Sequence, residues 1–238
     1  EDFKPKNIEI TNGEKYIKEQ MSSILCQLNK DDEIIISDDG SKDSTIEILF
    51  SFHDSRIKIL HNKGEHGFIG NFENALKNAK GDYIFLSDQD DVWMPNKVSV
   101  ILENLKKVDL VVHDAELIDG DGNITGKNYY SFLHHSSGFL MNLWQTRFLG
   151  CCMAFRKSVL DECLPFPNNV VGHDYWIGMY SLIKYKVLFI PDILLKYRRH
   201  GGNVSPSSEK SNNSFFYKLY NKRYHLLRAI VIRMFNAN

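Results

Sequence analysis

The chain has 238 residues, a formal net charge of −1 at pH 7 and 43% hydrophobic residues. This composition suits a globular protein with a sizeable core, and the charge creates no global field that would favour nucleic acid as a partner. The four cysteines lack the spacing of a zinc site, which favours a reducing, cytoplasmic compartment. The first ten residues lack the apolar segment of a signal peptide, and no run is long enough to span a bilayer.

Strands and helices alternate through the first half of the chain. Short apolar runs predict strands, and apolar residues at helical spacing predict the helices between them. The strands are expected at 33–37, 56–61, 83–86 and 109–113, and the helices at 14–28, 45–52, 71–79 and 96–107. This alternation predicts an α/β fold, with a Rossmann-like, mostly parallel sheet flanked by helices and joined by right-handed crossovers.

The second half is less regular. A tight turn at 119–123 predicts two antiparallel strands, and a surface loop is expected over 129–143. Further on, the pattern predicts a strand at 148–156, a helix at 158–163 and a strand at 187–191. The segment 205–214 is rich in serine and asparagine and is predicted to be a flexible linker.

The last 24 residues, 215–238, have a distinct composition. They contain no acidic residue, and apolar side chains are interleaved with five basic ones, Lys218, Lys222, Arg223, Arg228 and Arg233. A helix here would be basic and amphipathic, which suits an anionic membrane surface or a partner groove. A helix that packs on its own domain explains the pattern equally well, so both interpretations stay open.

The predicted strand that starts at Tyr83 ends in a group of carboxylates, Asp88, Asp90 and Asp91. Asp88 and Asp90 are two residues apart, so an extended backbone points them the same way. Open α/β sheets bind ligands at the carboxyl ends of their strands, and paired oxygen ligands suit Mg²⁺ or Mn²⁺. The alternative is a solvated acidic turn; the buried-type strand directly before the acids favours a metal site.

Four stretches form a pattern in chain order, at 37–45, 81–93, 172–176 and 197–204. Together they resemble family 2 glycosyltransferases of the GT-A fold, most closely the bacterial rhamnosyltransferase-like branch, in which Ser-Asp-Gln-Asp-Asp-Val-Trp is familiar. Any one of the motifs is weak evidence, whereas four in register are strong. The resemblance covers roughly residues 12–204.

The resemblance implies a division of the chain into two parts. Residues 1–204 would form the GT-A domain, with a nucleotide-sugar half at about 1–115 and a smaller antiparallel acceptor half at about 116–204. Residues 205–238 would form the linker and the basic C-terminal helix.

The resemblance also implies the residue roles. Asp174 would be the catalytic base that takes a proton from the acceptor hydroxyl. Mn²⁺ or Mg²⁺ would be bound by Asp90, Asp88 and His200. The nucleoside-diphosphate sugar donor would be bound by Thr11, Asp39, Asp88, Arg198 and Arg199. The acceptor would contact Gly150, Cys151, His173 and Trp176.

This sequence departs from the family pattern in two places. Most members have Glu-Asp where this chain has His173-Asp174. The family's apolar first strand is replaced here by a segment that contains Pro5 and several charged residues, which is unfavourable for a buried strand. The second departure predicts a distorted strand beside the donor site.

The sequence therefore predicts a metal-dependent, inverting glycosyltransferase. Its donor would be dTDP-rhamnose or a UDP-sugar, and its acceptor a cell-surface polysaccharide or a lipid-linked glycan. The basic tail would hold the enzyme at the inner face of the membrane, and nucleic acid is not expected as a partner. Two alternatives are a degenerate, non-catalytic binding domain and a sugar nucleotidyltransferase. The latter would need a glycine-rich, basic loop after the first strand, which Asn12-Gly13-Glu14 does not supply.

Overall fold

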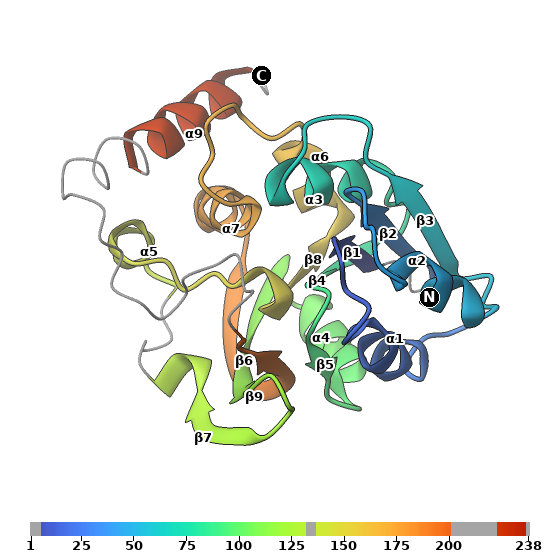
Figure 1. Cartoon of the computed structure of the whole chain (residues 1–238). Helices are drawn as coiled ribbons and strands as arrows, with labels where there is room; N and C mark the ends of the chain where they lie inside the picture. Colours follow the sequence, from blue (N-terminus) through green and yellow to red (C-terminus); the bar gives the residue numbers. More distant parts are fainter. Residues whose placement is uncertain (1–5, 132–136, 201–222, 237–238) are drawn as a thin grey trace.

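The computed structural model describes residues 6–131, 137–200 and 223–236 (Figure 1). Its strands form a single sheet in the order β3-β2-β1-β4-β8-β6-β9-β5, with β7 paired to β6. The strands are β1 Lys6–Ile10, β2 Ile34–Asp38, β3 Ile57–His61, β4 Tyr83–Ser87, β5 Val92–Trp93, β6 Leu110–Ile118, β7 Ile124–Asn128, β8 Met153–Arg156 and β9 Val187–Arg198. The α-helices are α1 Ile17–Leu25, α2 Thr45–Ser51, α3 Phe68–Lys77, α4 Lys97–Leu105, α5 Phe139–Trp144, α6 Lys157–Cys163, α7 His173–Lys184 and α9 His225–Asn236. Two 3-10 turns are η1 Tyr129–Ser131 and η2 Gly150–Cys152.

The first four strands of this order are parallel, as the alternation of strands and helices predicts. The expectation of a distorted first strand is wrong for the backbone of β1. It pairs with β2 along its whole length, from Lys6 opposite Ile34 to Ile10 opposite Asp38, and with β4 on its other side. Backbone hydrogen bonds to two neighbours explain why an unfavourable composition still forms a strand at this position.

The remaining strands extend the same sheet in a mixed arrangement. Strand β8 is antiparallel to β4 and β6, β7 is antiparallel to β6, and β5 is antiparallel to β9, whereas β6 and β9 are parallel. The sheet is therefore parallel in its first half and mixed overall. Strand β6 crosses the predicted boundary between residues 115 and 116, so both halves share one sheet. The division into two halves stays a prediction.

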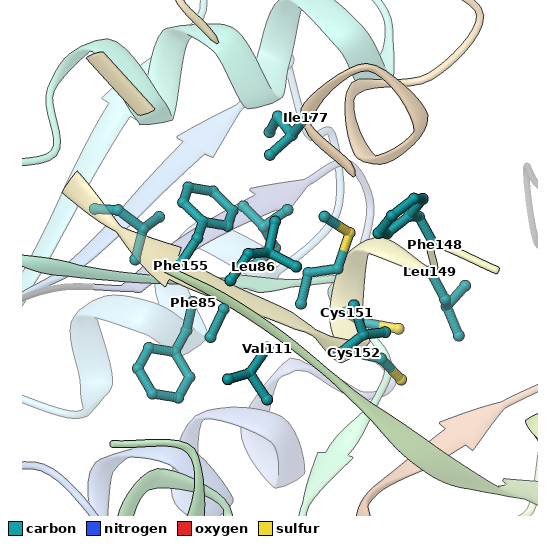
Figure 2. Packing of buried hydrophobic residues seen from close by; sticks show 14 of the residues in the cluster. Phe85, Leu86, Val111, Phe148, Leu149, Cys151, Cys152, Phe155 and Ile177 are labelled. Carbon is teal, nitrogen blue, oxygen red and sulfur yellow. The ribbon is translucent and has the colours of Figure 1, made fainter. Parts of the chain in front are cut away.

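Helices cover both faces of the sheet. Helix α3 contacts β1 and β2 and also meets α7, while α4 contacts β6 and β8, and Figure 1 shows α3, α6 and α7 on the face opposite α1 and α4. Neighbouring residues of one strand are consequently buried on opposite faces. Figure 2 shows Phe85 pointing to one side of the sheet with Val111, and Leu86 pointing to the other. This is why the central strands have nearly continuous apolar sequences.

Three segments differ from the sequence-based expectation. Helix α7 is 12 residues long, whereas the sequence indicated only the 172–176 motif. The helix was not predicted because most of its residues are buried, so it lacks the polar face that would reveal the helical period. Helix α5 lies inside the expected loop. The expected strand at 148–156 begins only at Met153, because residues 150–152 form the 3-10 turn η2.

The C-terminal helix α9 packs on the domain. Leu226 and Ile230 are buried, and the Arg233 guanidinium donates hydrogen bonds to the carbonyls of Glu162 (3.0 Å) and Leu164 (2.7 Å). The opposite face exposes apolar side chains, among them Leu227, Val231 and Phe235. The predicted linker 205–214 and the tail lysines Lys218 and Lys222 lie outside the described residues. None of the helices described is long and apolar enough to cross a membrane.

Candidate active site

The acidic residues lie in a turn at the carboxyl end of β4, between β4 and the short strand β5. The Ser87 hydroxyl accepts hydrogen bonds from Gln20 Nε2 at 3.0 Å and from Trp93 Nε1 at 3.2 Å. Strand β5 in turn pairs with β9. Residues 88–91, which we call the acidic turn, are therefore fixed at both ends.

Two carboxylates of the acidic turn lie close together. Potential ligand atoms of Asp88, Asp91 and Cys151 are all within 4.8 Å of one another. Asp91 is fully buried; its Oδ1 accepts the Arg198 backbone N–H at 3.0 Å, and its Oδ2 has no hydrogen-bond partner in the described part of the chain. Desolvation and the charges of Asp90 and Asp174 raise the pKa of Asp88 to about 7. A bound cation would relieve this repulsion.

The residues present fit an oxygen-liganded divalent cation. Burial raises the pKa of the Cys151 thiol well above its usual range, so the sulfur stays protonated, and the carboxylates are the hard ligands that Mg²⁺ or Mn²⁺ prefers. Asp90 lies beside this group and is hydrogen-bonded to His200, with 2.9 Å between Asp90 Oδ2 and His200 Nε2. Of the three predicted metal ligands, Asp88 and Asp90 lie in the acidic turn and His200 contacts Asp90, whereas the group of close ligand atoms combines Asp88 with Asp91 and Cys151. Which of them binds the metal stays a prediction.

Arg198 anchors the acidic turn to the neighbouring helix. Its guanidinium is buried, donates hydrogen bonds to the Asp90 carbonyl (2.9 Å) and Glu19 Oε2 (2.7 Å), and lies 4.5 Å from the centre of the Tyr16 ring. A positioning role therefore accounts for Arg198 without the predicted grip on the diphosphate. Arg199 is half-buried and donates its backbone N–H to the Ile118 carbonyl. Donor binding by either arginine stays a prediction.

Lys97 belongs to this site, although the sequence analysis gave it no role. It is fully buried, donates a hydrogen bond from Nζ to the Cys151 carbonyl (2.7 Å), and lies 4.2 Å from the centre of the Trp93 ring. Burial lowers the pKa of Lys97, while the nearby thiols and the carboxylates of Asp91 and Asp88 oppose this shift. The sequence pattern indicated the burial of Lys97, because this residue lies on the same side of α4 as the apolar positions 101 and 105.

Two of the predicted donor residues, Asp39 and Thr11, directly follow the carboxyl ends of strands β2 and β1. The Asp39 carboxylate accepts hydrogen bonds from Asn62 Nδ2 (2.9 Å) and the Gly67 backbone N–H (2.8 Å), and it contacts His66 Nδ1 at 2.8 Å. Burial alone would raise the pKa of Asp39, but these partners lower it overall. Thr11 exchanges two backbone hydrogen bonds with the side chain of Gln89 in the acidic turn, at 2.7 and 3.0 Å.

The predicted base, Asp174, lies in the first turn of α7 and is half-buried. Its Oδ1 accepts the Tyr175 backbone N–H at 2.7 Å. A Cβ atom at Gly172 would lie only 2.6 Å from this oxygen, so the glycine makes room for the carboxylate. The charge of Asp174 contributes to the raised pKa of Asp88, so the two carboxylates lie within electrostatic range of each other.

The predicted acceptor residues separate into two groups. Gly150 and Cys151 form η2, and His173 lies directly before Asp174, so these three border the site. Trp176, in contrast, is fully buried and donates its indole N–H to the Cys163 carbonyl at 3.0 Å. It has no surface for an acceptor, so the structure corrects this assignment: Trp176 is a core residue, and the side chain of Cys151 is equally buried and cannot contact an acceptor either.

An α/β sheet covered by helices on both faces, with an acidic turn at the end of its fourth strand, is typical of the GT-A fold of glycosyltransferases. Residues 8–164 match the profile of glycosyl transferase family 2, which is more than half of the chain. The chain belongs to this family.

Relatives of known sequence support this placement. The Escherichia coli enzyme named UDP-Glc:alpha-D-GlcNAc-diphosphoundecaprenol beta-1,3-glucosyltransferase WfgD is 29% identical over 93% of this chain and 89% of its own length. The glycosyltransferase GlyG of Streptococcus pneumoniae is 26% identical over 83% of this chain and 71% of its own length. Two Rickettsia glycosyltransferases match 83% of this chain, which spans only 64% of their length.

Solved structures confirm the fold. S. aureus TarS residues 1–349, in complex with UDP-GlcNAc, superposes with a TM-score of 0.73 at 18% identity over 99% of this chain and 67% of its own. The mannosyltransferase PcManGT from Pyrobaculum calidifontis, in complex with GDP-Man and Mn²⁺, gives a TM-score of 0.63 at 15% identity over 98% of this chain and 74% of its own.

Proposed function

We propose that this chain is the catalytic domain of a metal-dependent, inverting glycosyltransferase that uses a nucleoside-diphosphate sugar. The observation that carries the proposal is the pair of close carboxylates in the acidic turn, Asp88 and Asp91, with the half-buried carboxylate of Asp174 within electrostatic range of Asp88. One group of acids can bind a cation and the donor diphosphate, while the separate acid is available to deprotonate an acceptor. A single displacement with one base inverts the anomeric carbon.

The cation would be held by the carboxylates of the acidic turn, with Asp88 and Asp90 as the assigned ligands and His200 beside them. When bound, Mn²⁺ or Mg²⁺ supplies Lewis-acid stabilisation of the negative charge on the departing diphosphate. Arg198 holds the turn through the Asp90 carbonyl, and Lys97 holds the neighbouring η2 through the carbonyl of Cys151, whose sulfur lies beside Asp88 and Asp91. A Mn²⁺ ion in a related fold, PcManGT, supports this assignment.

Asp174 takes the proton of the attacking acceptor hydroxyl. Its Oδ1 accepts a hydrogen bond from the Tyr175 backbone N–H in the first turn of α7, which fixes the direction of the carboxylate. Proton removal by a positioned side chain contributes typically about 10²–10⁴-fold to a rate. We assign this contribution to Asp174.

For the donor we propose a UDP-sugar, with dTDP-rhamnose as the second candidate. WfgD is named for UDP-Glc, and the TarS structure contains UDP-GlcNAc. Asp39, at the end of β2, would accept a hydrogen bond from the nucleotide base. For the acceptor we propose a lipid-linked or polymeric glycan, since WfgD is named for a diphosphoundecaprenol-linked GlcNAc.

We also propose that helix α9 contacts a membrane surface, because a lipid-linked glycan acceptor would be located there. The helix has no acidic residue, Arg228 is exposed, and Val231 and Phe235 expose apolar surface. Flotation with anionic vesicles, but not with neutral ones, is the expected result. Equal recovery with both, or with neither, contradicts a membrane role for this helix.

The proposal is tested by incubating the protein with UDP-Glc, UDP-GlcNAc or dTDP-rhamnose, Mn²⁺ and a short-chain lipid diphosphate that carries GlcNAc. Mass spectrometry should detect acceptor extended by one hexose, N-acetylhexosamine or deoxyhexose unit, according to the donor. Asp174→Asn should lose transfer by about 10²-fold or more while keeping its melting temperature. An Asp174→Asn variant with full activity contradicts the assignment of the base.

The two alternatives are not favoured. A sugar nucleotidyltransferase would form a nucleotide sugar and diphosphate from a sugar phosphate and a nucleoside triphosphate, and a separate incubation with those two substrates would detect this product by mass spectrometry. A degenerate binding domain would leave the acids of the turn without a task, although they are held in place from several elements. Intact donor binding without any turnover by the wild-type protein would support the degenerate domain.

A further inference from the structure

The short helix α5 presents three large apolar side chains to solvent. Leu140, Met141 and Trp144 are 76%, 53% and 68% exposed, whereas Asn142 of the same helix is fully buried. Scattered single apolar residues at a surface are normal, but three on a helix of six residues form a patch, and such patches mark interaction sites. The helix therefore has an inner side that packs on the protein and an outer side without a partner in the described part of the chain.

Two arginines hold α5 rigidly in this orientation. The buried Arg147 donates a hydrogen bond from Nη1 to the Gln145 carbonyl at 2.8 Å. Arg223 donates to the carbonyls of Leu143 (3.0 Å) and Trp144 (2.9 Å), and its guanidinium carbon lies 4.9 Å from the centre of the Trp144 ring. These bonds satisfy carbonyls at the end of the helix, which has no further turn to accept them. The exposed side chains are thus fixed outward by the fold.

Helix α9 continues the exposed patch of α5. Arg223, which stacks on Trp144, is followed in the chain by Tyr224, and exposed apolar residues then recur at helical spacing, at Leu227, Val231 and Phe235. This stripe begins beside α5 and runs along α9. We call the two parts together the α5–α9 surface, with the members Leu140, Met141, Trp144, Tyr224, Leu227, Val231 and Phe235.

The charges around the α5–α9 surface are positive. No acidic residue occurs in the segments 122–160 and 215–238, from which its two helices come. Arg228 is exposed on α9 and shares a cavity with Asp161 and Glu162 of α6, but a lysine pairs with each of these two acids. Arg223 and Arg228 therefore set the local charge. Cations beside apolar side chains, with a tryptophan among them, are typical of a surface that rests on an anionic bilayer.

The same charges disfavour a second copy of the chain as the occupant. Two α5–α9 surfaces placed face to face would bring like charges together without an acid to compensate them, and like charges across an interface are costly. An anionic lipid surface supplies the missing negative charge and also accepts the apolar side chains. The combination of charge and exposure favours lipid over a copy of this chain.

The α5–α9 surface lies next to the side of the site that carries Asp174. The hydroxyl of Tyr175, the residue after Asp174 in the first turn of α7, donates to the Leu143 carbonyl of α5 at 3.3 Å. Figure 1 shows α5 and α9 at the end of the molecule away from α2 and β3. A bilayer in contact with this surface would therefore lie beside Asp174 and far from β3.

We propose that α5 is a membrane-contacting element that acts together with the exposed stripe of α9, and that the α5–α9 surface holds the Asp174 side of the site against an anionic bilayer. This extends the membrane contact proposed for α9 to a second helix and gives the bound protein a defined orientation. The benefit of that orientation rests on the proposed function, because it presents the base to an acceptor that is linked to a lipid.

Trp144 provides a direct probe for this contact. The chain has three tryptophans, of which Trp93 and Trp176 are 2% and 0% exposed, so a change in the polarity around an exposed indole reports on Trp144. Vesicles of phosphatidylcholine with phosphatidylglycerol should shift the tryptophan emission to shorter wavelength. Vesicles of phosphatidylcholine alone should produce a much smaller shift, and a Trp144→Phe variant should lose the shift while it still floats with the anionic vesicles.

The double variant Leu140→Ser, Met141→Ser tests α5 without removing the probe. Its partition onto the anionic vesicles, measured by flotation, should fall about tenfold or more, because two apolar side chains no longer enter the lipid. The matched control is Phe50→Ser, which removes a 65% exposed side chain from α2 at the other end of the molecule and should stay within about twofold. Both variants should keep the melting temperature of the wild type, since the replaced side chains are exposed.

Transfer assays with UDP-Glc or UDP-GlcNAc and Mn²⁺ separate orientation from catalysis. The double variant should lose about tenfold in rate on a long-chain GlcNAc-diphospholipid embedded in the anionic vesicles. It should stay within about twofold of the wild type on a short-chain acceptor in solution, because α5 supplies no group to the reaction.

Three results overturn the proposal. An unchanged Trp144 emission with anionic vesicles removes the lipid contact of α5, and an equal shift with neutral vesicles removes the role of the cations. Flotation of the double variant equal to that of the wild type leaves α9 as the membrane element without α5. A dimer that forms with rising protein concentration and is lost in the double variant makes the surface an interface between copies.

The proposed function can fail separately. Vesicle binding with the Trp144 shift, but without transfer to either acceptor by the wild-type protein, supports the α5–α9 surface and contradicts the transferase activity. Transfer to the short-chain acceptor without vesicle binding contradicts the surface alone.

Discussion

Lys97 shows how a single buried cation can hold an acidic site together. Its ammonium group donates to the Cys151 carbonyl at 2.7 Å and lies near the carboxylates of Asp88 and Asp91. Within the core, the positive charge of Lys97 offsets part of the negative charge of these two carboxylates. A Lys97→Met variant fills the same volume but leaves the carbonyl unpaired and the carboxylates uncompensated.

We expect Lys97→Met to lower the free energy of unfolding by about 1–3 kcal/mol, the usual cost of leaving a buried polar group unsatisfied. Urea denaturation monitored by circular dichroism measures it. The control is Lys106→Met, whose side chain is 57% exposed and pairs with Glu103 at the surface, and it should stay within about 0.5 kcal/mol. Equal stability of the two variants would show that Lys97 does not support the turn.

Asp39 gives a pH-dependent prediction. Burial tends to raise the pKa of Asp39, but hydrogen bonds from Gly67, His66 and Asn62 lower this pKa below its value in the unfolded chain, which is about 3.9. The charged form therefore stabilises the fold fully above that unfolded pKa, and this contribution is lost as the pH falls through the folded pKa. The stability advantage of the wild type over Asp39→Asn should thus be largest near pH 6–7.

Urea unfolding at pH 6.5, 5, 4 and 3 measures that difference, which should shrink toward pH 3. The exposed Asp31→Asn change is the surface control, with little difference from wild type at pH 6.5. A difference between wild type and Asp39→Asn that is constant across the series would mean that the hydrogen bonds do not favour the carboxylate.

At the scale of single residues, the sequence predicted the acids and missed their surroundings. Asp88, Asp90 and Asp174 stand in recognisable motifs, and in the structure the charges of Asp90 and Asp174 act on Asp88. The burial of Trp176 could not be predicted, because helix α7 is apolar on nearly every side and its sequence does not reveal which side faces the core. Pairing across the chain, such as Arg198 with Glu19, depends on tertiary contacts that no local pattern contains.

At the scale of elements, prediction succeeded wherever the period was clear. The bounds of α2, α4, β2 and β3 lie within a few residues of the predicted ranges. Each of these elements has a clear apolar stripe or apolar run, and turn residues border it in the sequence. Strand β9 was expected to end at Pro191 but continues to Arg198 as a strand paired with both β6 and β5. Its proline lies at a register shift, where no ladder hydrogen bond is required.

Helix α9 offers a test in two adjacent residues. Ile230 is 2% exposed and packs in the core, whereas Val231 is 51% exposed. Ile230→Ala should lower the free energy of unfolding by about 2–4 kcal/mol, because a buried methyl-rich side chain is lost and a cavity remains. Val231→Ala, on the same helix, should stay within about 0.5 kcal/mol.

Chemical denaturation measures both variants under the same conditions. If the two substitutions cost the same, α9 does not dock on the domain through Ile230 in solution. That result would favour the alternative that the helix serves a membrane or a partner, which the tail sequence left open.

At the scale of the whole molecule, one sheet joins the donor residues and the base. Strands β2 and β4 carry Asp39 and the acidic turn at their ends, and β8 and β6 continue the sheet toward the acceptor side, where α7 places Asp174. Ligands that bind across this edge therefore contact residues from many elements. Binding of such a ligand to the folded chain alone must stabilise the entire fold.

UDP with Mn²⁺ should raise the melting temperature of the wild-type protein by about 5–10 °C when UDP is at 100 times its dissociation constant. Mass action gives about 2.7 kcal/mol at that ratio, and one kcal/mol shifts the melting temperature of a domain of this size by about 2–4 °C. EDTA should remove most of the shift, because the acidic turn and the diphosphate repel each other without a cation. Differential scanning fluorimetry measures all of these conditions.

Asp90→Ala should lose the Mn²⁺-dependent part of this shift, because Asp90 is assigned to the cation and lies 2.9 Å from His200. The matched control is Asp121→Ala, an exposed acid in the turn between β6 and β7, which should keep the full shift. A UDP shift that is the same in EDTA, or that Asp90→Ala retains, would mean that donor binding needs no cation at the acidic turn. The negative charge of Asp88 and Asp91 would then be offset by the protein alone, through Lys97, the Arg198 backbone N–H and the Cys151 thiol, and the metal-dependent proposal would be wrong.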